Sequence, residues 1–212
     1  MRRLEDGAST TQGVTPLSKT KEFLKVLNVE DVFGVDIDTS FVSTIQCFRS
    51  LVDLHVDVRC SSEDGSDECI FKLNDDNITE LAMALTQLES LILGRQCAEN
   101  ICLTTVACLL PISVHCSSKL RRLEIHFNTT NIVNDLRNIS EDPRFQQLRS
   151  RPKCPLTSLH ANWIPLELHE SDLEIVAKGM VDIFPSLTDC KGIEKSWNEL
   201  SWKITDLREG SG

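Results

Sequence analysis

The sequence lacks the short motifs that mark most nucleotide-binding and hydrolytic sites. Its nine glycines are dispersed, so there is neither a GxGxxG nor a GxxxxGK phosphate loop, and no GxSxG stretch presents a nucleophilic serine. Such loops bring backbone N–H groups close to a phosphate or an oxyanion. We therefore predict a non-enzymatic chain with no cofactor. An α/β enzyme is the third-ranked interpretation, and it would require buried strands and a pocket with perturbed titrating groups.

The sequence also lacks a basic stretch and a long apolar stretch. The formal net charge of the 212 residues is −10, and the largest basic groups are Arg121-Arg122 and Arg149/Arg151/Lys153. Phosphate contacts need clustered Lys and Arg, so nucleic acid is excluded as a partner. No apolar run approaches the roughly 20 residues of a membrane helix. The polar N-terminus has no apolar segment behind its two arginines, so we expect no signal peptide and a disordered tail over residues 1–18.

Cysteine pairs at metal-ligand spacing are missing too. The nine cysteines are odd in number and include no CxxC. The dense stretch from Cys97 to Cys116 also contains Cys102, Cys108 and His115, but its spacings are irregular for zinc. We interpret these residues as core thiols and predict no metal. Free thiols without an export signal indicate a reducing, intracellular location, cytoplasmic or nuclear.

What the chain does contain is a repeat. The pattern Leu-x-x-Leu-x-(Val, Leu, Ile or Ala) occurs five times, with starts 27, 37, 32 and 36 residues apart, and a weaker sixth copy begins at Leu187. Repetition at this scale indicates a solenoid in which each unit is a strand plus a return segment. The predicted strands are Leu24–Val29, Leu51–Val58, Leu88–Leu93, Leu120–Phe127 and Leu156–Ala161. Because every return path is alike, we expect them to be parallel and adjacent in chain order.

Each predicted strand alternates apolar and polar residues. Residues 51–58 (LVDLHVDV) and 120–127 (LRRLEIHF) show this clearly. Alternation with a period of two means one buried face and one wet face. A doubly wound sheet, covered by helices on both faces, would instead show continuous apolar strands. The sequence therefore predicts an α/β solenoid, an arc of parallel strands with helices on its convex side only.

The segments between the strands predict helices and two insertions. Helix starts are expected at Thr39 or Ser40, at Asn77-Ile-Thr-Glu80 and at Ser171-Asp-Leu-Glu174, the last two as capping boxes. Residues 104–115 are also helical by pattern, with Pro111 as a kink. Residues 61–68 (SSEDGSDE) predict an acidic loop, and residues 141–155, with three prolines, predict an irregular connection. A final helix places four apolar residues on one face to cover the end of the stack: Ile193, Trp197, Leu200 and Ile204.

These repeats resemble leucine-rich repeats. The strands follow Cys154-Pro-Leu156 or Phe184-Pro-Ser-Leu187, and residues 85–94 (LTQLESLILG) with 120–127 are similar to the repeat half of fungal F-box proteins. The resemblance covers roughly residues 70–190 and implies a leucine-rich-repeat-like domain over residues 19–208. In that family an N-terminal F-box docks on the cullin-ligase adaptor, and the repeats recognise the protein to be ubiquitinated.

The chain departs from that family in two ways. Only 23 residues precede the first repeat, too few for an F-box, and Leu110-Pro111 lacks the surroundings of the F-box signature. The Asn expected after each strand appears only at Asn128. We therefore expect an unknown protein partner, and the adaptor only if an F-box lies upstream. The alternative is a structural or regulatory repeat protein that works without a ligase.

The wet strand positions form the predicted partner-binding face. His55 and His160 occupy the same slot of their repeats, where Glu124 stands in another repeat. Acidic residues outnumber arginine among these positions, which favours a basic or histidine-reading partner segment. A wet face must be polar whether or not it binds anything, and that simpler interpretation stays open. The predicted face consists of Asn28, Asp53, His55, Asp57, Arg122, Glu124, His126, Ser158, His160 and Asn162.

Overall fold

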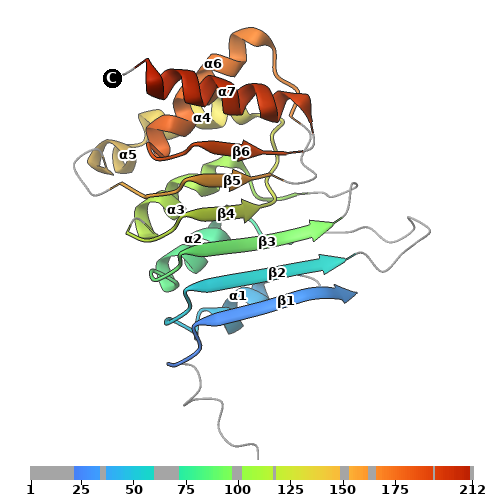
Figure 1. Cartoon of the computed structure of the whole chain (residues 1–212). Helices are drawn as coiled ribbons and strands as arrows, with labels where there is room; N and C mark the ends of the chain where they lie inside the picture. Colours follow the sequence, from blue (N-terminus) through green and yellow to red (C-terminus); the bar gives the residue numbers. More distant parts are fainter. Residues whose placement is uncertain are drawn as a thin grey trace, which may run out of the picture.

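Six parallel strands form one open sheet in which the spatial order β1-β2-β3-β4-β5-β6 equals the chain order (Figure 1). The computed structural model describes residues 22–33, 37–59, 72–96, 102–116, 118–148, 153–161, 166–192 and 194–210. The predicted tail 1–18, the acidic loop 61–68, Asn162 and Ile193 lie outside these ranges. Strands and helices alternate, so the chain is an α/β protein, and the predicted parallel pairing in chain order is confirmed.

The strands begin two residues later than the repeat pattern because the first leucine of each unit precedes the strand. Their bounds are β1 Val26–Phe33, β2 Asp53–Arg59, β3 Ser90–Gln96, β4 Arg122–Ile125, β5 Ser158–His160 and β6 Asp189–Lys191. The helices are α1 Thr39–Ile45, α2 Asp75–Ala84, α3 Leu109–His115, α4 Ile132–Glu141, α5 Pro143–Leu148, α6 Glu170–Ile183 and α7 Lys195–Glu209, with a 3-10 turn η1 at Val106–Cys108.

Equivalent leucines stand side by side across the sheet. The register pairs Leu27 with Leu54, and then Leu91, Leu123, Leu159 and Cys190 follow in one row. From Leu54 onward each member is at most 1% exposed, whereas Leu27 on the edge strand is only partly buried. A second buried row contains the first leucine of each unit: Leu51, Leu88, Leu120, Leu156 and Leu187. These rows form the centre of the core.

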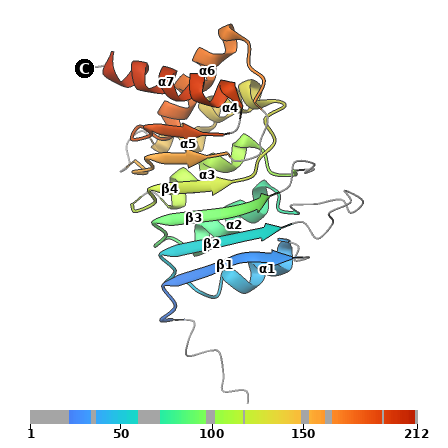
Figure 2. The same cartoon turned by 45° about the vertical axis from the view of Figure 1, so that its right-hand side comes forward.

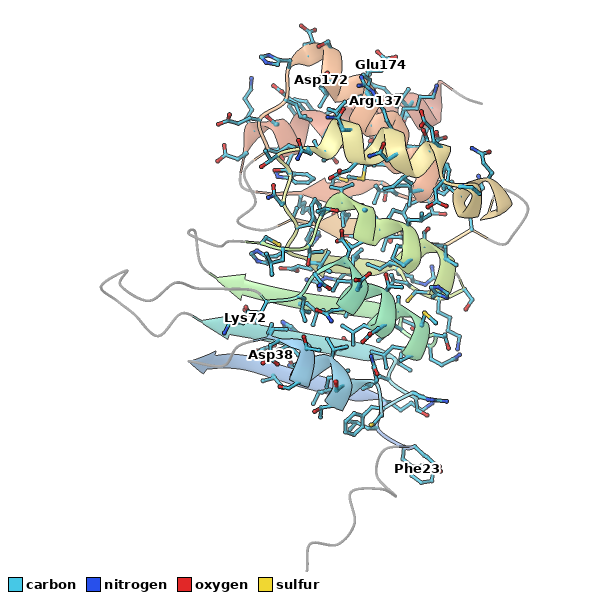
Figure 3. All side chains as sticks on the ribbon, turned by 180° about the vertical axis from the view of Figure 1, so that it is seen from behind. Phe23, Asp38, Lys72, Arg137, Asp172 and Glu174 are labelled. Atoms are coloured by element: carbon cyan, nitrogen blue, oxygen red, sulfur yellow. The ribbon has the colours of Figure 1, made fainter. Side chains whose placement is uncertain are left out.

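The helices α1 to α4 and α6 lie on one side of the sheet, behind it in Figure 1 and in front of it in Figure 3. Figure 2, turned by 45°, shows the same separation. This is the arrangement expected from alternating strands, since only the leucine-bearing face needs a cover. Within the described residues, the opposite face carries no helix in these views.

Helix α7 covers the last strand. Its residues Trp197, Leu200 and Ile204 are fully buried, as predicted for an end-covering helix, and it packs against α6 and β6. A Cβ on Gly192 would collide with the indole of Trp197, so this approach requires a glycine at that position. The backbone N–H of Cys190 on β6 donates to Ser201 Oγ of α7 at 3.3 Å.

Two predicted helix starts are wrong by a few residues. Helix α2 is capped by Asn74, which accepts from the Asn77 N–H at 3.0 Å, while Asn77 Oδ1 accepts from the Asn74 N–H at 3.3 Å. Asn77 is therefore the far member of the capping box and not its first residue. Helix α6 begins at Glu170 after His169, so Ser171 lies in its first turn and makes no cap. For helix α1, Thr39 or Ser40 was predicted as the cap, but the helix begins at Thr39 and its cap is Asp38.

The segments with prolines are more regular than the sequence suggested. Pro111 sits in the first turn of α3, where a missing N–H is tolerated, so residues 104–115 form η1 followed by a continuous short helix. The connection 141–155 contains α5, which starts at Pro143 for the same reason. No described helix combines the length and apolar character needed to cross a bilayer.

We predict that Leu123→Ala lowers the free energy of unfolding by about 2–5 kcal/mol, since a fully buried leucine leaves a cavity. The matched change Leu27→Ala should cost clearly less, because Leu27 is only partly buried at the sheet edge. Urea unfolding of both variants checks this. A cost below about 1 kcal/mol for Leu123→Ala would falsify the assigned core row.

Buried thiols make a second stability prediction. Burial raises the pKa of Cys154 to about 11 and of Cys116 and Cys190 to about 12, from an ordinary value of 9.0. The folded state keeps these protons while the unfolded state loses them, so their contribution is complete below pH 9.0 and is lost as pH rises through about 11 to 12. The unfolding free energy should therefore fall steadily above pH 9.0. Cys47→Ser should leave this decline unchanged, because Cys47 is exposed. A flat profile over that range would contradict the burial of these thiols.

Candidate functional site: the polar face of the sheet

Parallel pairing also aligns the side chains that point away from the helices. One row follows the register Val26, Asp53, Ser90, Arg122, Ser158 and Asp189. The next row is Asn28, His55, Ile92, Glu124, His160 and Lys191. The predicted slot shared by His55, Glu124 and His160 is therefore one physical row. Residues far apart in the sequence become neighbours only through this register.

His160 is the centre of a polar cluster on β4, β5 and β6. Its Nδ1 lies 3.5 Å from Glu124 Oε2, and its Nε2 lies 3.6 Å from Asp189 Oδ2. The Ser158 hydroxyl shares a 2.8 Å hydrogen bond with Nε2 and donates to Asp189 Oδ2 at 3.3 Å. Ser158 thus links the imidazole of His160 to the Asp189 carboxylate, and Glu124 lies at the other ring nitrogen.

Each carboxylate of this cluster also has a cation on its outer side. Arg122 lies 3.3 Å from Glu124, and Lys191 Nζ lies 2.8 Å from Asp189 Oδ2. The side chains of Glu124 and His160 are 15% and 17% exposed, while those of Arg122 and Lys191 are 49% and 60% exposed. The acidic and imidazole groups are thus held in place, and the cations can move to meet a partner.

Lys191 controls the ionisation of Asp189. Burial raises the pKa of this carboxyl, but the hydrogen bond from Lys191 and its charge, with His160 and Ser158, outweigh burial and hold the pKa below its ordinary 3.8. A lowered carboxyl pKa adds stability above the ordinary value, and this stability is lost as pH falls through the folded value. Asp189 is therefore an anion at neutral pH.

A second polar group lies on β1 and β2. Glu30 Oε1 accepts from Asn28 Nδ2 at 2.9 Å and lies 3.2 Å from His55 Nδ1. Strand β3 separates the two groups, because Ile92 stands in the same row between His55 and Glu124 and is only 6% exposed. The face therefore has two polar groups with acidic side chains, one on each side of strand β3, and the apolar Ile92 lies between them.

The structure places most of the predicted face where alternation puts it. Arg122, Glu124, Ser158 and His160 come together, and Asp53, His55 and Asp57 lie on β2. The prediction for His126 is wrong, since it is 4% exposed. Strand β4 ends at Ile125, and the Asn128 N–H donates to Thr104 O at 2.8 Å, so the chain has turned away from the sheet face by His126.

Sequence reasoning missed Asp189, Lys191 and Glu30. The sixth leucine copy carried the signal, because Leu187 places Asp189 and Lys191 at the slots of Arg122 and Glu124. In the first copy, Glu30 occupies the slot that Asp57 has in the second. The predicted first strand ended at Val29, one residue before Glu30, and no strand was predicted for the sixth copy.

Ser158, His160 and Glu124 are connected in the order of a hydrolytic triad, which makes them a candidate nucleophile site. Two features oppose that chemistry. When Ser158 donates to Asp189, its oxygen accepts from His160, which reverses the proton transfer required of a general base. The Ser158 N–H also donates already to Arg121 O at 3.1 Å, whereas an oxyanion site needs free donors.

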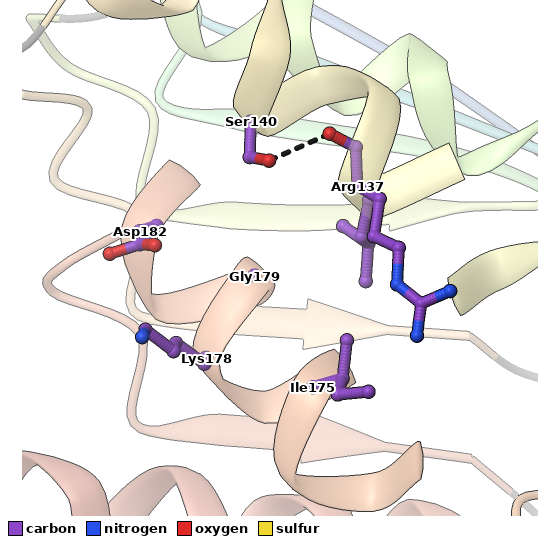
Figure 4. Close-up of a pocket in the computed structure, with 7 residues that line it drawn as sticks. Arg137, Ser140, Ile175, Lys178, Gly179 and Asp182 are labelled. Carbon is purple, nitrogen blue, oxygen red and sulfur yellow. Dashed lines mark hydrogen bonds between the residues drawn. The ribbon is translucent and has the colours of Figure 1, made fainter. Parts of the chain in front are cut away.

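The helical side offers a different kind of surface. A groove of about 440 Å³ lies between α4 and α6 and is lined by residues such as Arg137, Ser140, Lys178 and Asp182 (Figure 4). Its floor is closed where Gly179 meets Leu136, since an added Cβ would lie 3.1 Å from the leucine.

Across the described ranges, no three His, Cys, Asp or Glu side chains are placed to hold a metal ion. No protein-family model matches the sequence, and no curated protein matches it significantly.

We predict that Lys191→Ala raises the pKa of Asp189, because the main group that lowers it is removed. Carbon-detected NMR titration of the Asp189 carboxyl measures the change directly. The control Lys195→Ala removes a cation that pairs with Glu199 on α7 at 2.8 Å and should leave Asp189 unaffected. An unchanged Asp189 titration in Lys191→Ala would show that the 2.8 Å ion pair is not formed in solution.

Proposed function

We propose that this chain is a non-catalytic protein-interaction module built as a leucine-rich-repeat-like solenoid. The observation that carries the proposal is the register: five successive return segments bring equivalent side chains into rows, with the helices on one side of the sheet. Repeat proteins of this kind use the extended strand face as a binding surface. The sequence resemblance to the substrate-recognition repeats of F-box receptors supports the same class of function.

The charge of the face favours a basic partner segment. Its described carboxylates are Glu30, Asp53, Asp57, Glu124 and Asp189, and its cations are Arg122 and Lys191. Glu30, Glu124 and Asp189 are held by hydrogen bonds from neighbouring side chains, so little rotamer entropy is lost when they meet an arginine or lysine. Complementary charge mainly accelerates encounter, and the association rate should therefore decrease with salt.

A role outside a ubiquitin ligase is the second candidate. The only Leu-Pro dipeptide, Leu110-Pro111, is buried in α3, with Leu110 3% exposed, so it offers no docking surface to an adaptor. Binding of the purified chain to the cullin-ligase adaptor tests whether a docking segment lies within these 212 residues. A stable complex supports the ligase-linked role over the second candidate.

We predict that the double change His55→Ala and Glu124→Ala weakens partner binding about tenfold or more, equivalent to about 1.4 kcal/mol, without unfolding the chain. The reason is that both side chains stand on the polar row and not in the core. Affinity capture with the wild-type chain identifies the partner, and titration with the purified partner measures the change.

The matched control is Lys178→Ala with Asp182→Ala, two exposed residues of the α4–α6 groove. The control variant should bind like the wild type. If the groove variant loses the partner while the sheet-face variant keeps it, the helical side is the binding surface and the proposed face is wrong.

A further inference from the structure

The two ends of the sheet differ in which groups form hydrogen bonds with the backbone N–H and C=O groups of the edge strand. At the β6 end, α7 places the Ser201 hydroxyl against the Cys190 N–H at 3.3 Å, and Arg208 donates to the Leu187 carbonyl at 3.2 Å. Trp197, Leu200 and Ile204 seal the core beneath it. This end is closed by side-chain partners from a dedicated helix.

At the β1 end, no described element replaces the missing strand. The Lys25 carbonyl accepts from the Asp53 N–H at 3.1 Å, so by alternation the N–H and C=O groups of Val26, Asn28 and Glu30 point to the outer edge. Within the described part of the chain, β1 pairs with β2 alone. An edge of eight residues with open hydrogen-bonding groups is a template for another strand.

This end exposes two large apolar side chains beside charged ones. Phe23 is 76% exposed and Val26 57% exposed, and Figure 3 shows Phe23 at the free end of the stack. Gln46, the C-cap residue of α1, donates to Glu80 of α2. Phe41 on α1 and Phe48, three residues after the helix ends, are only partly buried. Together with the half-buried Leu27, these side chains form a part of the apolar core that is not fully covered at this end.

Charge decides which occupant fits this surface. The exposed charged residues at this end are two of each sign: Glu22 and Glu30 are acidic, and Lys25 and Arg49 are basic. The exposed residues of α2, α4, α6 and α7 all include charged side chains. In a chain of net charge −10, two copies repel wherever identical charged surfaces meet. A surface whose exposed charges balance in this way can meet its own copy without that repulsion.

We propose that the β1 edge is the interface with a second copy of this chain, in a dimer with twofold symmetry. A twofold axis brings the same edge from both copies together and makes the two β1 strands antiparallel. The pairing is irregular between Val29 and Val32, which leaves Val26–Val29 as the regular segment and puts the axis near Leu27 and Asn28. The two sheets become continuous, and Phe23, Phe41 and Phe48 are covered. This proposal does not depend on the polar face having a partner.

Sedimentation velocity of the full chain over a concentration series tests the dimer. The wild type should sediment as a dimer, while Val26→Pro, which removes an outward N–H, and Phe23→Asp should each raise the dimer dissociation constant at least about tenfold. The control Trp202→Asp changes a side chain that is 69% exposed on α7, at the opposite end, and should dimerise like the wild type.

A wild-type chain that stays monomeric at every concentration overturns the proposal. So does a dimer that both edge variants leave unchanged, because the interface then lies elsewhere. Circular dichroism verifies that each variant is folded. If Val26→Pro is unfolded, Phe23→Asp decides alone, since a side chain that is 76% exposed contributes little to folding.

Discussion

The alignment of equivalent leucines across parallel strands is the interaction on which the rest of this structure depends. Leu54, Leu91, Leu123 and Leu159 stand in register, and each fills the space beside its neighbour with almost no exposed surface. Because side chains alternate along a strand, a shift of one residue in the strand register would point every leucine side chain toward solvent. Burial of this row therefore fixes the register, and the register fixes which polar residues become neighbours on the other face.

The polar cluster around His160 is a consequence of that constraint. Glu124 and Asp189 are 65 positions apart in the sequence, but they flank the same imidazole because β4, β5 and β6 pair in register. The buried leucine row thus sets the positions of the polar side chains on the opposite face of the sheet without contacting them. A protein partner would meet a surface whose acidic groups are already oriented and whose cations, Arg122 and Lys191, remain largely exposed.

The two ends of the sheet show what a stack of repeats requires. Each inner strand is covered by its neighbours, whereas an end strand needs a partner of another kind. Helix α7 provides this at β6 through Trp197 and Ser201. The proposed second copy would provide it at β1, and the polar face would then extend across both chains. The two proposals use different surfaces of the chain, so both can hold together.

The sequence by itself determined the strand positions, their parallel order and the side of the sheet that carries helices, because these follow from local periodicity and repeat spacing. It also located most of the polar face, including Arg122, Glu124, Ser158 and His160. Helix starts were less predictable: Asn74 and Asn77 both suit a capping box, and only packing selects between them. Contacts across the sheet were decided by tertiary structure alone. His126 is buried where the chain leaves β4, and Asp189 joins His160, because a residue's neighbours depend on the path of other segments through space.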